Sequence, residues 1–159
     1  MTELSELYDR DFVLWSKEQA AALRRAKASN LPLDWENLAE EIESLGKSQR
    51  TELNSQIRRI LRHLLKLEAS PAADPRAGWR ATIRDARAEV EELLETSPSL
   101  RREVEEVIRR QSVTAAKLAA DDLEGHGEPA ASINTRLAQM AGFTAELVLG
   151  DWFPDPPPP

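Results

Sequence analysis

The sequence contains no cysteine, only two histidines and only six glycines. Without cysteine the chain has no disulfide, no thiolate metal ligand and no cysteine nucleophile. Two histidines exclude a three-histidine metal site, and the sequence shows neither a Walker loop nor a Gly-x-Gly-x-x-Gly phosphate-binding turn. No apolar run approaches the roughly 20 residues that span a bilayer. We therefore expect a soluble, cytoplasmic protein that needs no metal, no cofactor and no membrane.

Aromatic residues are also few, at 5% of the chain, and β-branched residues do not alternate as they would in strands. Ala, Leu, Glu and Arg, which favour helices, dominate instead. The pattern predicts an all-α bundle of four main helices with a long second helix and a short C-terminal helical segment. The main helices are expected at about residues 9–29, 35–67, 76–95 and 98–123. In the C-terminal segment a short helix is expected at Ile133, Leu137, Met140 and Ala141, and Thr144 can cap one more turn that Gly150 closes. We expect one domain over residues 1–154 and a proline-rich tail over residues 155–159.

The second predicted helix carries an apolar stripe along its whole length. Steps of three and four residues connect its members: Trp35, Leu38, Ile42, Leu45, Gln49, Leu53, Ile57, Ile60, Leu64 and Leu67. At 1.5 Å per residue the helix would be roughly 50 Å long. Because its neighbours are shorter, part of the stripe would stay uncovered and form a contact surface. This favours a non-enzymatic protein–protein interaction or self-association module, with a protein partner or a second copy as its ligand.

Charge is unevenly distributed along the chain, which has a net charge of −7. Residues 47–88 carry 10 basic and 4 acidic residues, whereas residues 1–46 carry 5 basic and 10 acidic ones. The basic block either pairs internally with its acidic neighbours or forms an exposed patch for nucleic acid or another anion. The candidate anion ligands are Arg62, Lys66, Arg76, Arg80, Arg84 and Arg87, because guanidinium groups suit bidentate pairing with phosphate or carboxylate.

His63 lies on the flank of the apolar stripe, about 60° from Ile60 around the helix. A histidine there is expected to pack its ring against the core. The alternative is catalytic, because the Arg58-x4-His63 spacing resembles that of HEPN ribonucleases, which are helical. Arg58 and His63 would point roughly 140° apart, so Arg59 is the better-placed partner. A ribonuclease that uses His63 with Arg58 or Arg59 is therefore the least favoured of the functions considered.

Several short motifs occur together in a characteristic order. They are Leu7-Tyr8-x-x-Asp11-Phe12-x-x-Trp15, Asp34-Trp35-x-x-Leu38-x-Glu40-Glu41-Ile42-x-x-Leu45-Gly46, His63-Leu64-Leu65-Lys66, Trp79-Arg80-x-Thr82-Ile83-Arg84-x-x-Arg87 and Ser97-Pro98-Ser99-Leu100. This set resembles the Domain of Unknown Function 29 family of bacterial proteins over about residues 4–124. The resemblance implies a helical fold and implies no activity.

Overall fold

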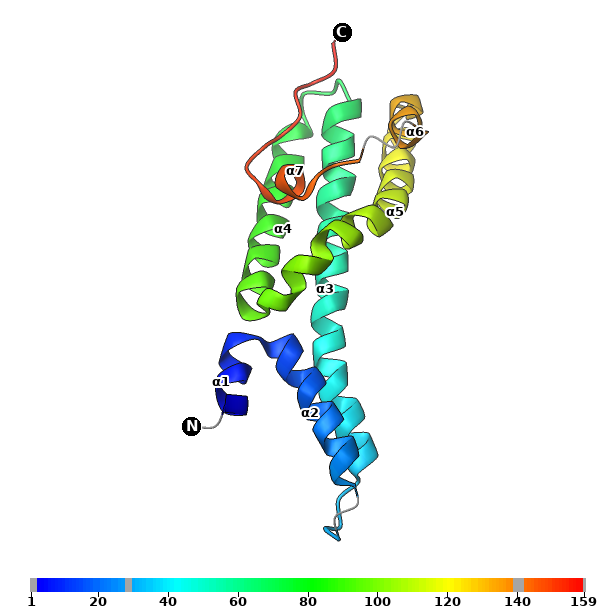
Figure 1. Ribbon diagram of the computed structural model, residues 1–159. Coiled ribbons are helices and arrows are strands. Elements are labelled where there is room, and N and C mark those ends of the chain that lie inside the picture. Colours follow the sequence, from blue (N-terminus) through cyan, green and yellow to red (C-terminus); the bar gives the residue numbers. More distant parts are fainter. Residues whose placement is uncertain (1–2, 28–29, 139–141, 159) are drawn as a thin grey trace. The chain divides into compact units, whose positions relative to one another are not determined.

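The computed structural model describes residues 3–27, 30–138 and 142–158, and all regular secondary structure in these ranges is helical. The prediction of an all-α fold is confirmed. Figure 1 shows the elements in order: α1 (Glu3–Arg10), α2 (Phe12–Ala26), α3 (Trp35–Ala69), α4 (Arg76–Thr96), the 3₁₀ helix η1 (Pro98–Glu103), α5 (Val104–Gly125), α6 (Ala131–Ala138) and α7 (Ala145–Leu149). Within the described ranges, no helix combines the length and apolar character that crossing a bilayer requires.

Residue contacts group the chain into two compact units. Unit 1 comprises Met1–Leu53 and Glu92–Arg102, and unit 2 comprises Asn54–Glu91 and Glu103–Pro159. Helices α3 and α4 each contribute residues to both units. The single domain expected over residues 1–154 stays a prediction.

The N-terminal region differs from the single helix predicted to begin near Asp9. Two helices replace it, because Asp11 has an extended backbone with φ −156° and caps a new helix, α2. One carboxylate oxygen of Asp11 accepts a hydrogen bond from the backbone N–H of Leu14 at 2.9 Å, which is the usual N-cap geometry. The predicted end of the first helix, at Ser29, lies outside the described residues.

Two serines tie unit 1 together. The buried Ser97 hydroxyl donates to Gln49 Oε1 at 2.8 Å and accepts from the backbone N–H of Val13 at 3.1 Å. Ser99 donates its backbone N–H and its hydroxyl to the carboxylate of Asp11, at 2.6 and 2.9 Å. The turn after α4 is thereby fastened to the start of α2 and to α3.

Unit 2 has an apolar core built from three helices. Its fully buried side chains include Ile57, Ile60, Leu61, Leu64 and Leu67 of α3, Ile83 and Ala86 of α4, and Ala115, Ala119 and Leu123 of α5. The predicted stripe of α3 is thus internal over its C-terminal half.

The C-terminal segment contains a predicted feature that the structure confirms. Thr144 caps α7 by accepting a hydrogen bond from the N–H of Leu147, and the N–H of Gly150 closes the helix on the carbonyl of Glu146. A short helix was also predicted around Ile133, and α6 lies there. Its predicted members Met140 and Ala141 lie outside the described residues.

Candidate functional site

All six predicted anion ligands lie in unit 2, where the side chain of Arg76 donates to backbone carbonyls. Its Nη1 donates to the carbonyls of Leu67 and Ser70, at 2.8 and 3.1 Å, and its Nη2 donates to that of Pro154 at 3.3 Å. Burial lowers the pKa of Arg76 from its ordinary value, and the positive charge of Arg80 lowers it further. Arg76 therefore joins the end of α3 to the C-terminal segment.

Arg87, further along α4, also donates to backbone carbonyls of the C-terminal segment. Its Nε donates to the carbonyl of Val148 at 2.8 Å, and its Nη2 donates to those of Leu147 and Trp152 at 3.0 and 2.7 Å. These bonds hold α7 and the residues after it beside α4, as Figure 1 shows. Burial is the main cause that lowers the pKa of Arg87.

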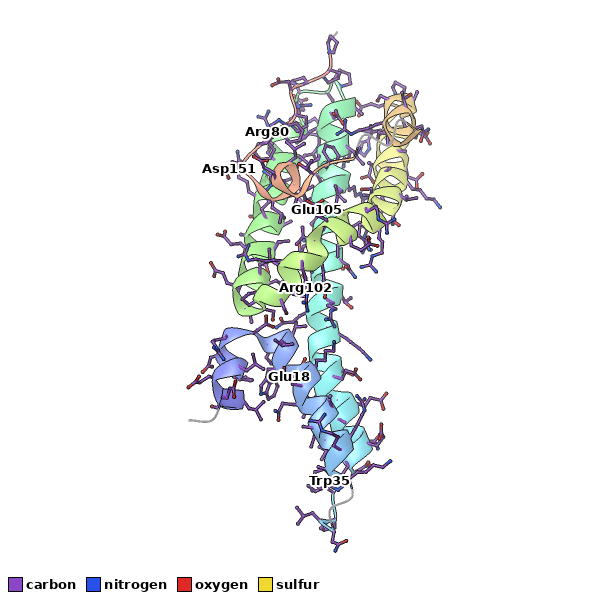
Figure 2. All side chains as sticks on the ribbon, in the orientation of Figure 1. Glu18, Trp35, Arg80, Arg102, Glu105 and Asp151 are labelled. Carbon is purple, nitrogen blue, oxygen red and sulfur yellow. The ribbon has the colours of Figure 1, made fainter. Side chains whose placement is uncertain are left out.

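Three guanidinium groups of α4 surround one aromatic ring. The central carbons of Arg80, Arg84 and Arg87 lie 5.6, 5.1 and 4.9 Å from the ring centroid of Phe153, within the range of cation–π attraction. Within the described ranges, the side chains of Arg80 and Arg84 form no hydrogen bond and no ion pair, and the buried Nε of Arg80 lacks a partner. Figure 2 labels Arg80 on α4, with Asp151 nearby after α7. We call Arg80, Arg84, Arg87 and Phe153 the arginine–Phe153 cluster.

The remaining two predicted anion ligands, Arg62 and Lys66, share one carboxylate. Arg62 donates from Nε and Nη2 to the two oxygens of Asp122, at 2.7 and 2.6 Å, and Lys66 Nζ lies 3.2 Å from the same group. The hydrogen bonds from Arg62 are the largest cause that lowers the pKa of Asp122. Lys66 Nζ also lies 4.6 Å from the ring centroid of Trp79. These two cations have an internal acidic partner on α5.

The side chains of the predicted catalytic candidates also form hydrogen bonds within the protein. His63 Nδ1 donates to the backbone carbonyl of Arg59 at 2.9 Å, and burial lowers the pKa of the His63 ring. Arg58 Nη1 donates to Gln111 Oε1 at 3.3 Å, and Arg59 Nη1 donates to Gln56 Oε1 at 3.5 Å. The ribonuclease hypothesis stays a prediction.

Exposed apolar side chains concentrate in unit 1. Of the eight large hydrophobic residues that the structure exposes within the described ranges, six belong to unit 1 and two to unit 2. The six are Leu4, Tyr8, Leu31, Leu33, Leu38 and Leu45, and the two are Val113 and Trp152. Scattered exposed leucines are normal on a protein surface, whereas a contiguous apolar patch is a candidate contact surface.

Two of these leucines lie on the same side of α3. Leu38 and Leu45 are seven residues apart, which places them within about 20° of each other around the helix, and they are 40% and 50% exposed. Leu31 and Leu33, in the segment before α3, are 61% and 50% exposed. We call Leu31, Leu33, Leu38 and Leu45 the leucine surface.

The sequence predicted one apolar stripe along α3 with an uncovered part. In unit 1 its members Leu38 and Leu45 are exposed, whereas Leu53 is buried. The buried positions of α3 in unit 1 are Ala39, Gly46 and Leu53, which lie about 100°, 80° and 60° round the helix from Leu38. Alanine and glycine at helical spacing were the signal that could have identified the covered face. Small residues let another helix approach closely, and that leaves the leucines outside.

The comparisons agree with this picture of an all-helical protein. The family described as "Domain of unknown function DUF29" matches residues 7–153. The chain belongs to the DUF29 family. No curated protein matches it. The structure is similar to the crystal structure of an alpha-helical protein of unknown function from Rhodospirillum rubrum, at 25% sequence identity and a TM-score of 0.59, with 89% of this chain and 88% of that chain covered. This DUF29 chain is thus similar to a solved helical protein whose function is also unknown.

Proposed function

We propose that this DUF29 protein is a protein-interaction module that binds a basic amphipathic helix of a partner protein on its leucine surface. The observation that carries the proposal is the exposure of Leu38 and Leu45 on one side of α3, together with Leu31 and Leu33 before it. A partner helix with leucine or isoleucine every three or four residues fits such a surface.

Burial of these side chains would supply the driving force. Removing a leucine side chain completely from water stabilises an assembly by about 1.5–3 kcal/mol, and these four are already about half buried. They would contribute a few kcal/mol together, before the entropy of association is subtracted. Such an interface would be weak unless further contacts, including charges, assisted it.

Charge on the flank of α3 favours a basic partner over a second copy. Asp34 and Glu41 lie about 40° and 60° from Leu38 on its solvent side, and both are exposed. A second copy that docked through the same surface would place carboxylates near carboxylates, which opposes self-association. A partner with lysine or arginine beside its leucines would meet opposite charges instead.

The test uses two synthetic peptides of equal length with leucine at heptad positions, one with lysine flanks and one with glutamate flanks. We expect the lysine peptide to bind at least tenfold more tightly in isothermal titration calorimetry. The Leu38→Glu and Leu45→Glu variants should lose this binding, and Glu41→Lys should shift the preference toward the glutamate peptide. Val113→Glu is the matched control, because Val113 is 66% exposed but lies on α5 in unit 2.

Sedimentation equilibrium distinguishes the alternative occupant. A monomer at all concentrations, with binding of the lysine peptide, supports the proposal. Self-association that Leu38→Glu abolishes would instead identify a second copy as the occupant. Equal affinity for both peptides, or binding that survives the leucine substitutions, would also overturn the proposal.

A further inference from the structure

We propose that the arginine–Phe153 cluster of unit 2 binds a phosphate group through Arg80 and Arg84. This site is separate from the leucine surface and does not depend on the proposed function. Its ligand would be a small dianionic phosphate, either free or carried as a monoester.

The first argument is the unused hydrogen-bonding capacity of the two arginines. Among the described residues, Arg76 and Arg87 donate to backbone carbonyls, whereas the side chains of Arg80 and Arg84 lie beside the ring of Phe153 and form no hydrogen bond. A guanidinium group over a ring presents N–H donors at its edge, and these can form bidentate bonds to an oxyanion. The buried Nε of Arg80 has no acceptor in the described residues, and such a donor is costly to leave unpaired.

The second argument is the spacing of the cations. Arg80 and Arg84 are four residues apart on α4, so their side chains arise from one face of the helix with Cβ atoms about 5–6 Å apart. Each can bind different oxygens of one tetrahedral anion. Because Phe153 contacts both guanidinium groups, part of the ordering cost of binding is already met in the free protein.

The third argument is the local excess of positive charge. The positive charge of Arg84 contributes to lowering the pKa of Arg87, after burial and against the opposite effect of Asp151. No carboxylate of the described residues forms an ion pair with Arg80 or Arg84, although Asp151 and Asp155 lie near enough to affect the pKa values of Arg87 and Arg76. A dianion would relieve the repulsion among three cations, and a monoanion such as acetate would relieve less of it.

The experiment is an NMR titration of the full chain with inorganic phosphate and, separately, with glycerol phosphate, read from the side-chain Nε–H signals of the arginines. We expect saturable shifts of the Arg80 and Arg84 signals, with weaker effects of acetate and weaker binding at high salt. Arg84→Gln should weaken phosphate binding about tenfold or more, because it removes hydrogen bonds to a charged group. Arg84 is exposed, so this variant should stay folded, which a circular-dichroism melt will verify.

Arg110→Gln is the matched control, because Arg110 is an exposed arginine on α5 in the same unit. It should change the dissociation constant less than twofold. Binding of glycerol phosphate and inorganic phosphate with equal dependence on Arg84 identifies the phosphate group itself as the recognised element. The proposal is overturned if the shifts do not saturate, or if Arg110→Gln weakens binding as much as Arg84→Gln. Binding of an RNA oligonucleotide that requires Arg84, with no binding of either small phosphate, would also overturn it.

Discussion

Substituting Gly46 by alanine tests whether α2 and α3 meet as the structure describes. A Cβ atom on Gly46 would overlap the hydroxyl of Ser16, whereas its next neighbours, Ser16 Cβ and Val13 O, would lie at ordinary distances of 3.5 and 3.6 Å. Ser16 is 1% exposed, and its hydroxyl donates to the carbonyl of Val13 at 2.9 Å. The conflict therefore involves one oxygen atom.

The expected magnitude follows from two opposing effects. Alanine is about 1 kcal/mol better than glycine in a helix interior, which favours the variant. Displacing the Ser16 hydroxyl breaks its hydrogen bond inside a packed site, which costs about 1–3 kcal/mol. In the natural background Gly46→Ala should therefore leave the free energy of unfolding unchanged or lower it by up to about 2 kcal/mol. In a Ser16→Ala background the overlap is absent, and Gly46→Ala should raise it by about 1 kcal/mol.

The assay is urea unfolding of all four proteins at 25 °C, followed by circular dichroism at 222 nm. The double-mutant cycle gives an expected coupling energy of about 1–3 kcal/mol between positions 16 and 46. Additive effects, with a coupling below about 0.5 kcal/mol, would refute the close approach of α2 and α3 at Gly46. A gain in stability from Gly46→Ala in the natural background would refute it as well.

Three further predictions concern unit 2. Asp122→Asn should lower the free energy of unfolding by about 1–2 kcal/mol in urea titrations, a modest value because Arg62 is 35% exposed and solvent screens the pair. The pKa of Asp122 is lowered in the folded state, so this contribution should be present above pH ~4 and disappear as the pH falls further. If the pairing is absent, the difference in unfolding free energy between the natural protein and the variant should not change with pH in this range. The pKa of His63 is lowered, so its ring should titrate below pH ~6.5 by NMR. The protein should lose stability as the pH falls below that value, since the unfolded chain takes up the proton more readily. A titration midpoint above pH ~6.5 would contradict the burial of the ring. Arg87→Lys should speed amide hydrogen exchange over residues 147–153 about tenfold or more by removing bonds to three carbonyls, and unchanged exchange there would exclude this anchoring role.

The sequence was sufficient for the helices that carry long apolar periodicity and clear ends. A proline-containing segment separates α3 from α4, and Pro98 begins η1 directly after the end of α4. The predicted bounds agree with the structure within a few residues. The break at Asp11 was missed, because Leu4, Leu7 and Tyr8 continue the apolar pattern of α2 without interruption. The extended backbone of Asp11, whose side chain accepts from the N–H of Leu14, separates the two helices.

The candidate sites were harder to predict because their chemistry depends on contacts distant in sequence. Arg87 and Arg84 have similar sequence surroundings. The side chain of Arg87 donates to carbonyls about 60 residues away, whereas the donors of the Arg84 side chain form no hydrogen bond with any described residue. The pairing of Arg62 with Asp122 likewise spans 60 residues. Charge counting left open whether the basic block pairs internally or forms an exposed patch, and it could not indicate which cations would have acidic partners.

The residues by which the chain resembles DUF29 proteins divide into two groups. Some have a structural explanation, since Asp11, Ser97 and Ser99 connect α2 to the turn after α4 through buried or partly buried hydrogen bonds. Others are exposed, and Leu38, Glu41 and Arg84 are of this kind. A packing requirement does not account for an exposed leucine or for an arginine with unused donors, whereas a bound partner or anion would. The exposed members of the family pattern are therefore the positions at which substitution should impair function while leaving the helical fold intact.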